Sequence, residues 1–126
     1  MATTSELWFQ RVMWVGIAAN VALAVPTLAW PAEMLAVSGL PEAVPLVWVR
    51  FASLSLILLS SFYVPAAVDC RRASVSAWLA VAGRLAGVLF FLSQPREYWL
   101  FGAYDFAFFL PQALLLLGAS RPGAPK

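Results

Sequence analysis

WLAVAGRLAGVLFFLSQPREYWLFGAYDFAFFLPQ, residues 78–112, decides the fold of this chain. The stretch consists of two apolar runs separated by the polar break at residues 94–97, with Arg84 in the middle of the first run and Asp105 inside the second. Ionisable side chains are costly in hydrocarbon, so within a membrane they face a bundle interior or a water-filled cavity. We therefore expect two membrane-spanning helices that bring this opposite-signed pair together.

The composition of the whole chain is that of a membrane protein. Of its 126 residues 63% are hydrophobic and 11% are charged, whereas soluble domains have roughly 25% charged residues. The eight basic residues form no run longer than Arg71-Arg72, so no nucleic-acid partner is predicted. With no His and only one Cys, the chain cannot supply a disulfide, a His-ligated haem or a Cys/His zinc site. We predict no cofactor and no metal site.

Four apolar runs have the length that a helix needs to cross a membrane, roughly 20 residues for a ~30 Å hydrocarbon core. They cover about residues 11–30, 46–68, 73–93 and 98–117. The sequence therefore predicts an all-α fold with one transmembrane domain over residues 1–126, an integral membrane four-helix bundle.

Shorter signals refine the ends and interiors of these spans. The first helix has hydroxyl side chains before Glu6, at residues 3–5, that are typical of a helix start. A short interfacial helix is expected near residues 34–37, in the connector between the first two spans. Pro26, Pro65 and Pro111 are expected to kink their spans.

The basic residues outside the apolar runs indicate an orientation. Four spans place Arg11, Arg71, Arg72, Arg121 and Lys126 on one side of the membrane and Arg96 on the other. Because cytoplasmic loops carry the excess of Lys and Arg, both termini are predicted to be cytoplasmic.

The chain also repeats itself at an offset of about 64 residues. The offset aligns Trp14 with Trp78, Asn20 with Arg84, Pro31 with Pro95 and Glu33 with Glu97, and Arg50-Phe51-Ala52 corresponds to Asp105-Phe106-Ala107. These matches predict two tandem two-helix repeats, about residues 8–68 and 73–118. Repeats of two spans share one orientation, so their pseudo-twofold axis would lie along the membrane normal.

The alignment predicts a polar cluster as the candidate site. Its members are Asn20, Glu33, Arg50, Arg84, Glu97, Asp105 and Gln112. For Arg84 and Asp105 two interpretations stay open, a structural ion pair and a functional one. Two arginines against one aspartate leave a positive excess, unless Glu33 or Glu97 pairs with Arg50.

Uncharged polar residues and small residues have simpler interpretations. Asn20, Thr27, the serines and Gln112 are expected to form hydrogen bonds between helices. Gly83 and Gly87 form a GxxxG pattern, which predicts close packing of the first and third spans. Cys70 stands beside Arg71 and Arg72, which favours its thiolate, yet it has no resolving Cys and is interpreted as incidental.

The layout resembles the DoxX-like group of small bacterial four-helix membrane proteins. The resemblance is carried by Arg50 early in the second span, Gly83-Arg84 in the third and Asp105 in the fourth. It implies the four-helix fold, the bacterial inner membrane and neighbouring membrane or redox proteins, and it brings no catalytic assignment.

The functional prediction is a non-catalytic accessory or scaffold subunit of a larger membrane complex, or a homo-oligomeric module. Four spans leave much helix surface to be covered, so the expected partners are the lipid bilayer and other membrane subunits or further copies of the chain. The alternative is an outward-open pocket or pore that binds a small anion or an amphipathic ligand, a quinone or a lipid head group, on Arg50 and Arg84. An enzyme is not expected, because an acid and two arginines offer neither a nucleophile nor a metal.

Overall fold

The computed structural model describes residues 3–42 and 45–119, which contain only helices and connecting turns. The helices are α1 (Thr4–Ala29), α2 (Pro31–Val37), α3 (Val47–Phe62), α4 (Val64–Val68), α5 (Ser74–Leu92), the single 3₁₀ turn η1 (Arg96–Tyr98) and α6 (Trp99–Ala119). Three stretches are long and apolar enough to cross a membrane: Thr4–Ala29, Ser74–Leu92 and Arg96–Ala119. The prediction of helices that are long and apolar enough to cross a membrane is confirmed for these three stretches.

The described chain divides into two compact units. One contains residues 3–16 with 63–119, and the other contains residues 17–42 with 45–62. Helix α1 contributes its first half to the first unit and its second half to the second. The predicted repeat halves are a different division of the chain, and the repeat stays a prediction.

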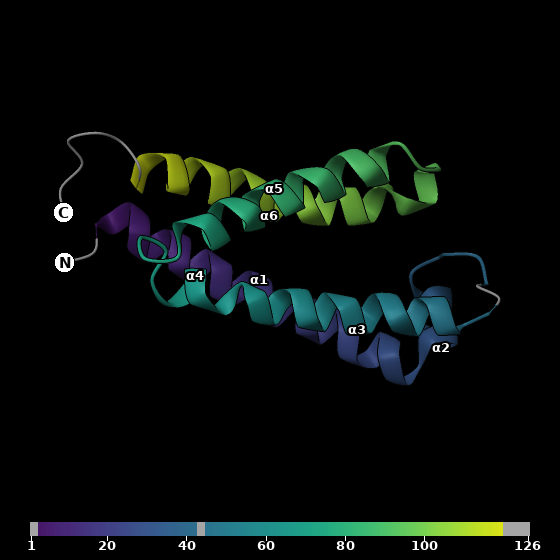
Figure 1. Ribbon diagram of the computed structural model, residues 1–126. Helices are drawn as coiled ribbons and strands as arrows, with labels where there is room; N and C mark the ends of the chain where they lie inside the picture. Colours follow the sequence, from purple (N-terminus) through teal and green to yellow (C-terminus); the bar gives the residue numbers. More distant parts are fainter. Residues whose placement is uncertain (1–2, 43–44, 120–126) are drawn as a thin grey trace. The chain divides into compact units, whose positions relative to one another are not determined.

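In the first unit, α5 and α6 form an antiparallel helical pair joined by η1 (Figure 1). The buried side chains of α5 include Ala77 and Ala80, and Ala66 and Ala67 of α4 are buried too. Small side chains allow helix axes to approach closely, which is how membrane helices gain van der Waals contact. Small residues therefore form part of the core of this unit, together with the large buried side chains of Phe9, Met13 and Leu116.

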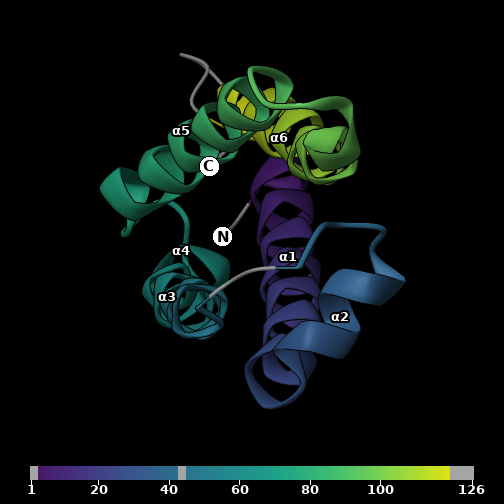
Figure 2. The ribbon, with the colours of Figure 1, turned by 90° about the vertical axis from the view of Figure 1, so that its right-hand side faces the viewer.

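In the second unit, α2 turns back sharply from the C-terminal end of α1 (Figure 2). Pro31 is the first residue of α2, where its missing N–H would have had no partner inside the helix. The short helix predicted near residues 34–37 is confirmed, and it begins three residues earlier.

Helix α1 begins at Thr4, several residues before the predicted span. The N–H of Glu6 donates to Thr3 Oγ1 at 3.2 Å, and the N–H of Thr3 donates to Glu6 Oε2 at 3.3 Å. This reciprocal pair is a capping box, which satisfies two N–H groups at the helix end. It confirms the predicted N-terminal cap.

The second apolar run, predicted as one span over about residues 46–68 with a kink at Pro65, consists of two helices that meet beside this proline. Helix α3 ends at Phe62, Tyr63 forms a turn, and α4 follows with Pro65 in its first turn. Proline has no N–H to donate and starts a helix more readily than it continues one. Pro26 and Pro111, in contrast, lie inside continuous helices. Arg121, Lys126 and most of the tail lie outside the described residues.

Candidate functional site

Arg84 and Asp105 form the ion pair predicted from the sequence. Nη1 of Arg84 lies 2.8 Å from Oδ1 of Asp105, and the two side chains are only 6% and 16% exposed. Arg84 comes from α5 and Asp105 from α6. Gly87 makes room for the pair, because a Cβ there would overlap the Asp105 carboxylate and stand 2.9 Å from its Cγ.

Aromatic rings of α6 cover the guanidinium group. The Cζ atom of Arg84 lies 4.8 Å from the ring centre of Phe108 and 5.4 Å from that of Tyr104. These distances are within the range of cation–π attraction, which strengthens when water is excluded. On the side of α1, a Cβ on Gly16 would stand 3.2 Å from Arg84 Nη2. The cation is thus enclosed by three helices.

The two glycines of the GxxxG pattern have partners other than the predicted one. The Asp105 carboxylate packs against Gly87, and a Cβ on Gly83 would stand 3.1 Å from the hydroxyl oxygen of Tyr63. The first and third spans do approach each other, but they do so at Gly16 and Arg84. The pattern correctly marks a close approach, and only the fold shows which elements approach.

Asn20 forms the predicted bond between helices. Its Nδ2 atom donates to Ser60 Oγ at 3.1 Å and connects α1 with α3 inside the second unit. The same prediction is wrong for Thr27 and Ser53, whose hydroxyls donate to the carbonyls of Leu23 and Val49 in their own helices. A serine or threonine hydroxyl in a helix can donate to the backbone carbonyl one turn earlier, and it then needs no acceptor on another helix.

Within the described residues, Gln112, Arg50, Glu33 and Glu97 form no hydrogen bond or ion pair with Asp105. Gln112 is buried on α6, and its Oε1 accepts no hydrogen bond from the described residues. Arg50, Glu33 and Glu97 are exposed, and within the described ranges none of them takes part in an ion pair. Of the seven predicted residues, the structure shows one ion pair and one separate hydrogen bond. Convergence of all seven stays a prediction.

A second ion pair was missed. Arg71 Nη2 donates to Glu6 Oε1, and the N–H of Cys70 donates to Gln10 Oε1 at 3.2 Å. Glu6 is buried on α1, while Arg71 follows α4. The residues are 65 apart in sequence, so no spacing signal connects them. The capping motif explains Glu6 by itself and gives no reason to look for a partner.

The surroundings of Cys70 contradict the expected thiolate. The side chain is 2% exposed and borders a cavity of about 150 Å³ that Glu6 and Arg71 also line. Burial raises the pKa of the Cys70 thiol to about 11, and the nearby carboxylates of Glu6 and Asp69 act in the same direction. Arg71 lowers the pKa of the thiol, and its effect is the smallest of these.

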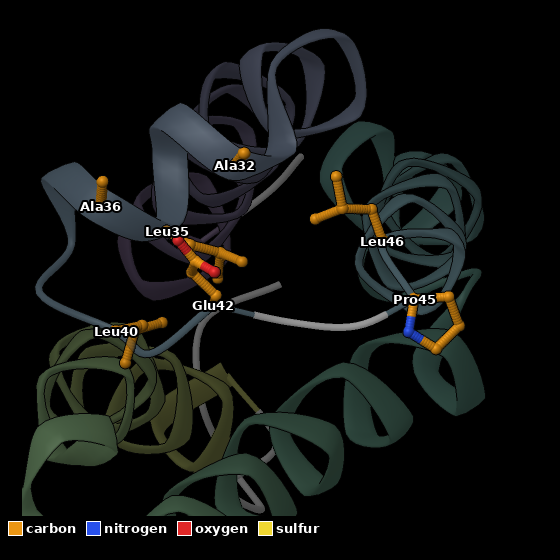
Figure 3. A pocket seen from close by; sticks show the side chains of 7 residues that line it. All are labelled: Ala32, Leu35, Ala36, Leu40, Glu42, Pro45 and Leu46. Atoms are coloured by element: carbon orange, nitrogen blue, oxygen red, sulfur yellow. The ribbon is translucent and has the colours of Figure 1, made fainter.

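A larger cavity in the second unit was not predicted from the sequence either. It has a volume of about 490 Å³ and lies between α2 and the start of α3 (Figure 3). Its lining residues are Ala32, Leu35, Ala36, Leu40, Glu42, Pro45 and Leu46. Arg50 and Arg84, the two arginines of the predicted ligand pocket, are not among these lining residues. A connector of Pro, Gly, Leu and Glu has no periodicity that would have indicated a cavity.

The contacts described at these sites are ion pairs, hydrogen bonds and cation–π contacts. No group of three His, Cys, Asp or Glu side chains that could hold a metal ion occurs among residues 3–42 and 45–119. Comparison with protein-family models, with curated proteins and with solved structures finds no match for this chain, so the DoxX-like resemblance stays an expectation from its residues.

Proposed function

We propose that this chain is a non-catalytic four-helix membrane module that assembles with other membrane subunits or with copies of itself. Three of the spans are the long helices α1, α5 and α6. For the fourth we take α3 and α4 together, because residues 47–68 rise about 33 Å at 1.5 Å per residue, enough for a hydrocarbon core. The proposed location is a bacterial inner membrane, with both termini in the cytoplasm.

The observation that carries this proposal is the enclosure of the Arg84–Asp105 pair. Each charge is satisfied by the other at 2.8 Å, and the rings of Tyr104 and Phe108 cover the cation. A charge that is neutralised and buried in this way attracts a substrate less, and the pair favours one pairing of helices over others. This supports a structural role for the polar centre and weakens the alternative in which Arg84 binds a ligand.

The apolar surface of the helices supports assembly. Only 17% to 28% of the most apolar stretch of each long helix is buried. Large side chains such as Leu79, Leu89 and Leu114 are mostly exposed. Lipid tails or neighbouring helices must cover these faces. Ala82 and Ala86 are exposed on α5 one turn apart, a spacing at which another helix approaches closely.

Native mass spectrometry of the protein released directly from its membranes tests this proposal. We expect a defined complex, either with a second protein or of several copies. The Arg84→Leu/Asp105→Leu double variant should keep that complex, because it removes both charges together, whereas Arg84→Leu alone should lose it. A wild-type protein that is released only as a monomer would contradict the proposal.

A further inference from the structure

The cavity between α2 and the start of α3 has the size and the lining of a ligand site. Its volume of about 490 Å³ lies within the range of small-molecule pockets, about 300 to 1,000 Å³. Leucine, alanine and proline side chains form most of the wall. Figure 3 shows the Glu42 carboxylate near the centre of the pocket, with Leu46 pointing inward from the α3 side. One carboxylate in an apolar wall is complementary to an amphipathic molecule with a cationic group.

We propose that this pocket binds a zwitterionic phospholipid that carries a primary ammonium group, with Glu42 accepting hydrogen bonds from the ammonium. Glu42 is the only charged side chain among the described residues that line the cavity. An ammonium has three N–H donors and forms charge-assisted bonds with a carboxylate. An anionic lipid would instead be repelled by Glu42. The site goes beyond the assembly role proposed above and does not depend on it.

Arg50 provides the positive charge for the phosphate of the same head group. Its N–H donates to the carbonyl of Leu46 at 3.1 Å, so Arg50 lies one turn after a pocket residue that directly precedes α3. Helical side chains lean toward the N-terminus of their helix, which for Arg50 is the direction of the pocket. Arg50 is exposed and forms no ion pair with any described residue. Glu42 in the connector before α3 and Arg50 in the first turn of α3 match the two charges of a zwitterion.

The position of the pocket along the chain fits a lipid rather than a soluble amine. Trp30 directly precedes α2 and is 61% exposed, and Trp48 follows the last pocket residue and is 67% exposed. Exposed tryptophans are typical of the level of lipid head groups in a membrane. Beyond Trp48 the exposed side chains of α3 include Phe51, Leu54 and Leu58. This apolar surface suits the acyl chains of the same lipid.

Lipid titrations followed by native mass spectrometry test the proposal. Phosphatidylethanolamine and phosphatidylglycerol with identical acyl chains are added to the delipidated protein, and the bound fraction of each is measured. We expect the wild type to prefer the ethanolamine lipid, and Glu42→Gln, at an exposed acid, to weaken its binding by about two- to fivefold, the range of an exposed ion pair. Arg50→Gln should weaken binding of both lipids. Glu33→Gln is the matched control, because Glu33 is an exposed acid of α2 outside the pocket lining.

Filling the pocket gives a second measurement that does not rely on charge. Ala36→Trp adds an indole to a residue of the cavity lining and should abolish the preference for phosphatidylethanolamine. Val37→Trp, at the next residue, adds the same group at a position that is 85% exposed and does not line the cavity. Circular dichroism checks that each variant is folded. Equal binding of the two lipids by the wild type, or an unchanged preference in both Glu42→Gln and Ala36→Trp, would overturn the proposal.

Discussion

At the scale of single residues, the ion pair between Arg84 and Asp105 has more influence on which structure forms than on how stable it is. Moving two charges out of water costs about as much as their attraction returns, so an intact buried pair contributes little net stability. Removing only one of the two partners is much more costly, because it leaves a buried charge without its opposite charge. The remaining charge then stays among the rings of Phe108 and Tyr104 after losing the opposite charge that it contacted at 2.8 Å.

The first prediction is a strong coupling between Arg84 and Asp105. Arg84→Leu and Asp105→Leu should each lower the free energy of unfolding by about 3–5 kcal/mol, the cost of a stranded buried charge. The double variant should lose clearly less than the sum of the two. Unfolding in detergent, followed by circular dichroism, gives the three values. Additive losses would mean that the two side chains act independently.

The second prediction concerns the reactivity of Cys70. With a thiol pKa of about 11 instead of 9.0, Cys70 should hold about a hundredfold less thiolate than an ordinary cysteine at pH 8. Maleimide should therefore modify it slowly in detergent. Glu6→Gln should accelerate the reaction, because it removes a carboxylate that raises the pKa. The control thiol is Arg72→Cys in a Cys70→Ser background, since residue 72 is exposed.

The raised pKa of the Cys70 thiol also predicts how the stability of the protein changes with pH. The folded protein retains the thiol proton to a higher pH than the unfolded chain does, so the contribution of Cys70 to stability should fall between pH 9.0 and about 11. Cys70→Ser should lack this part of the pH profile. Rapid labelling of wild-type Cys70 at pH 8, at the rate of the exposed control, would contradict both expectations.

At the scale of elements, the antiparallel pair of α5 and α6 depends on glycines. A Cβ on Gly87 would overlap the Asp105 carboxylate, and a Cβ on Gly102 would stand 3.3 Å from Cβ of Phe91. One glycine on each helix therefore lets the other helix approach. The break between α3 and α4 has a similar local origin, because Pro65 ends one helix and places Tyr63 against Gly83.

The third prediction compares two glycines of the same helix. Gly87→Ala should destabilise the protein by about 1–3 kcal/mol, the usual cost of overpacking, because the Asp105 carboxylate must give up its place beside Arg84. Gly83→Ala is the matched control. Its new methyl group meets only the end of the Tyr63 side chain, at 3.1 Å. Thermal unfolding of both variants in the same detergent measures the difference, and equal losses would show that Gly87 does not determine the approach of α6.

At the scale of the whole molecule, the proposed topology rests on the length of the helices and on the distribution of basic residues. Arg72 precedes α5 and Arg96 follows it, and both are exposed. If α5 crosses the membrane, these two positions lie on opposite sides. The buried Cys70 is a poor reporter of topology, so an exposed thiol has to be introduced.

The fourth prediction is that single cysteines at positions 72 and 96, in a Cys70→Ser background, label from opposite sides. A membrane-impermeant maleimide should modify Arg96→Cys in intact spheroplasts and Arg72→Cys only in inverted vesicles. The cytoplasmic side is assigned by the excess of basic residues near the ends of the spans. The reverse pattern would invert the orientation, and labelling of both from one side would exclude α5 as a span.

Much of the secondary structure and one part of the site could be read from the sequence. Apolar runs of the right length predict helices because a backbone in hydrocarbon must satisfy its own hydrogen bonds, and this depends only on local composition. The pairing of Arg84 with Asp105 was also predictable. Opposite charges in consecutive apolar runs have few other ways to be neutralised.

The remaining features required the tertiary structure, because they depend on which segments meet. Glu6 and Arg71 are far apart in sequence, and either residue is fully explained without the other by its own neighbourhood. The glycines at 83 and 87 mark close approaches, but their partners Tyr63 and Asp105 come from different elements. A periodic pattern specifies the face of a helix that is covered. What covers that face is decided by packing between distant segments, and packing has no local signature.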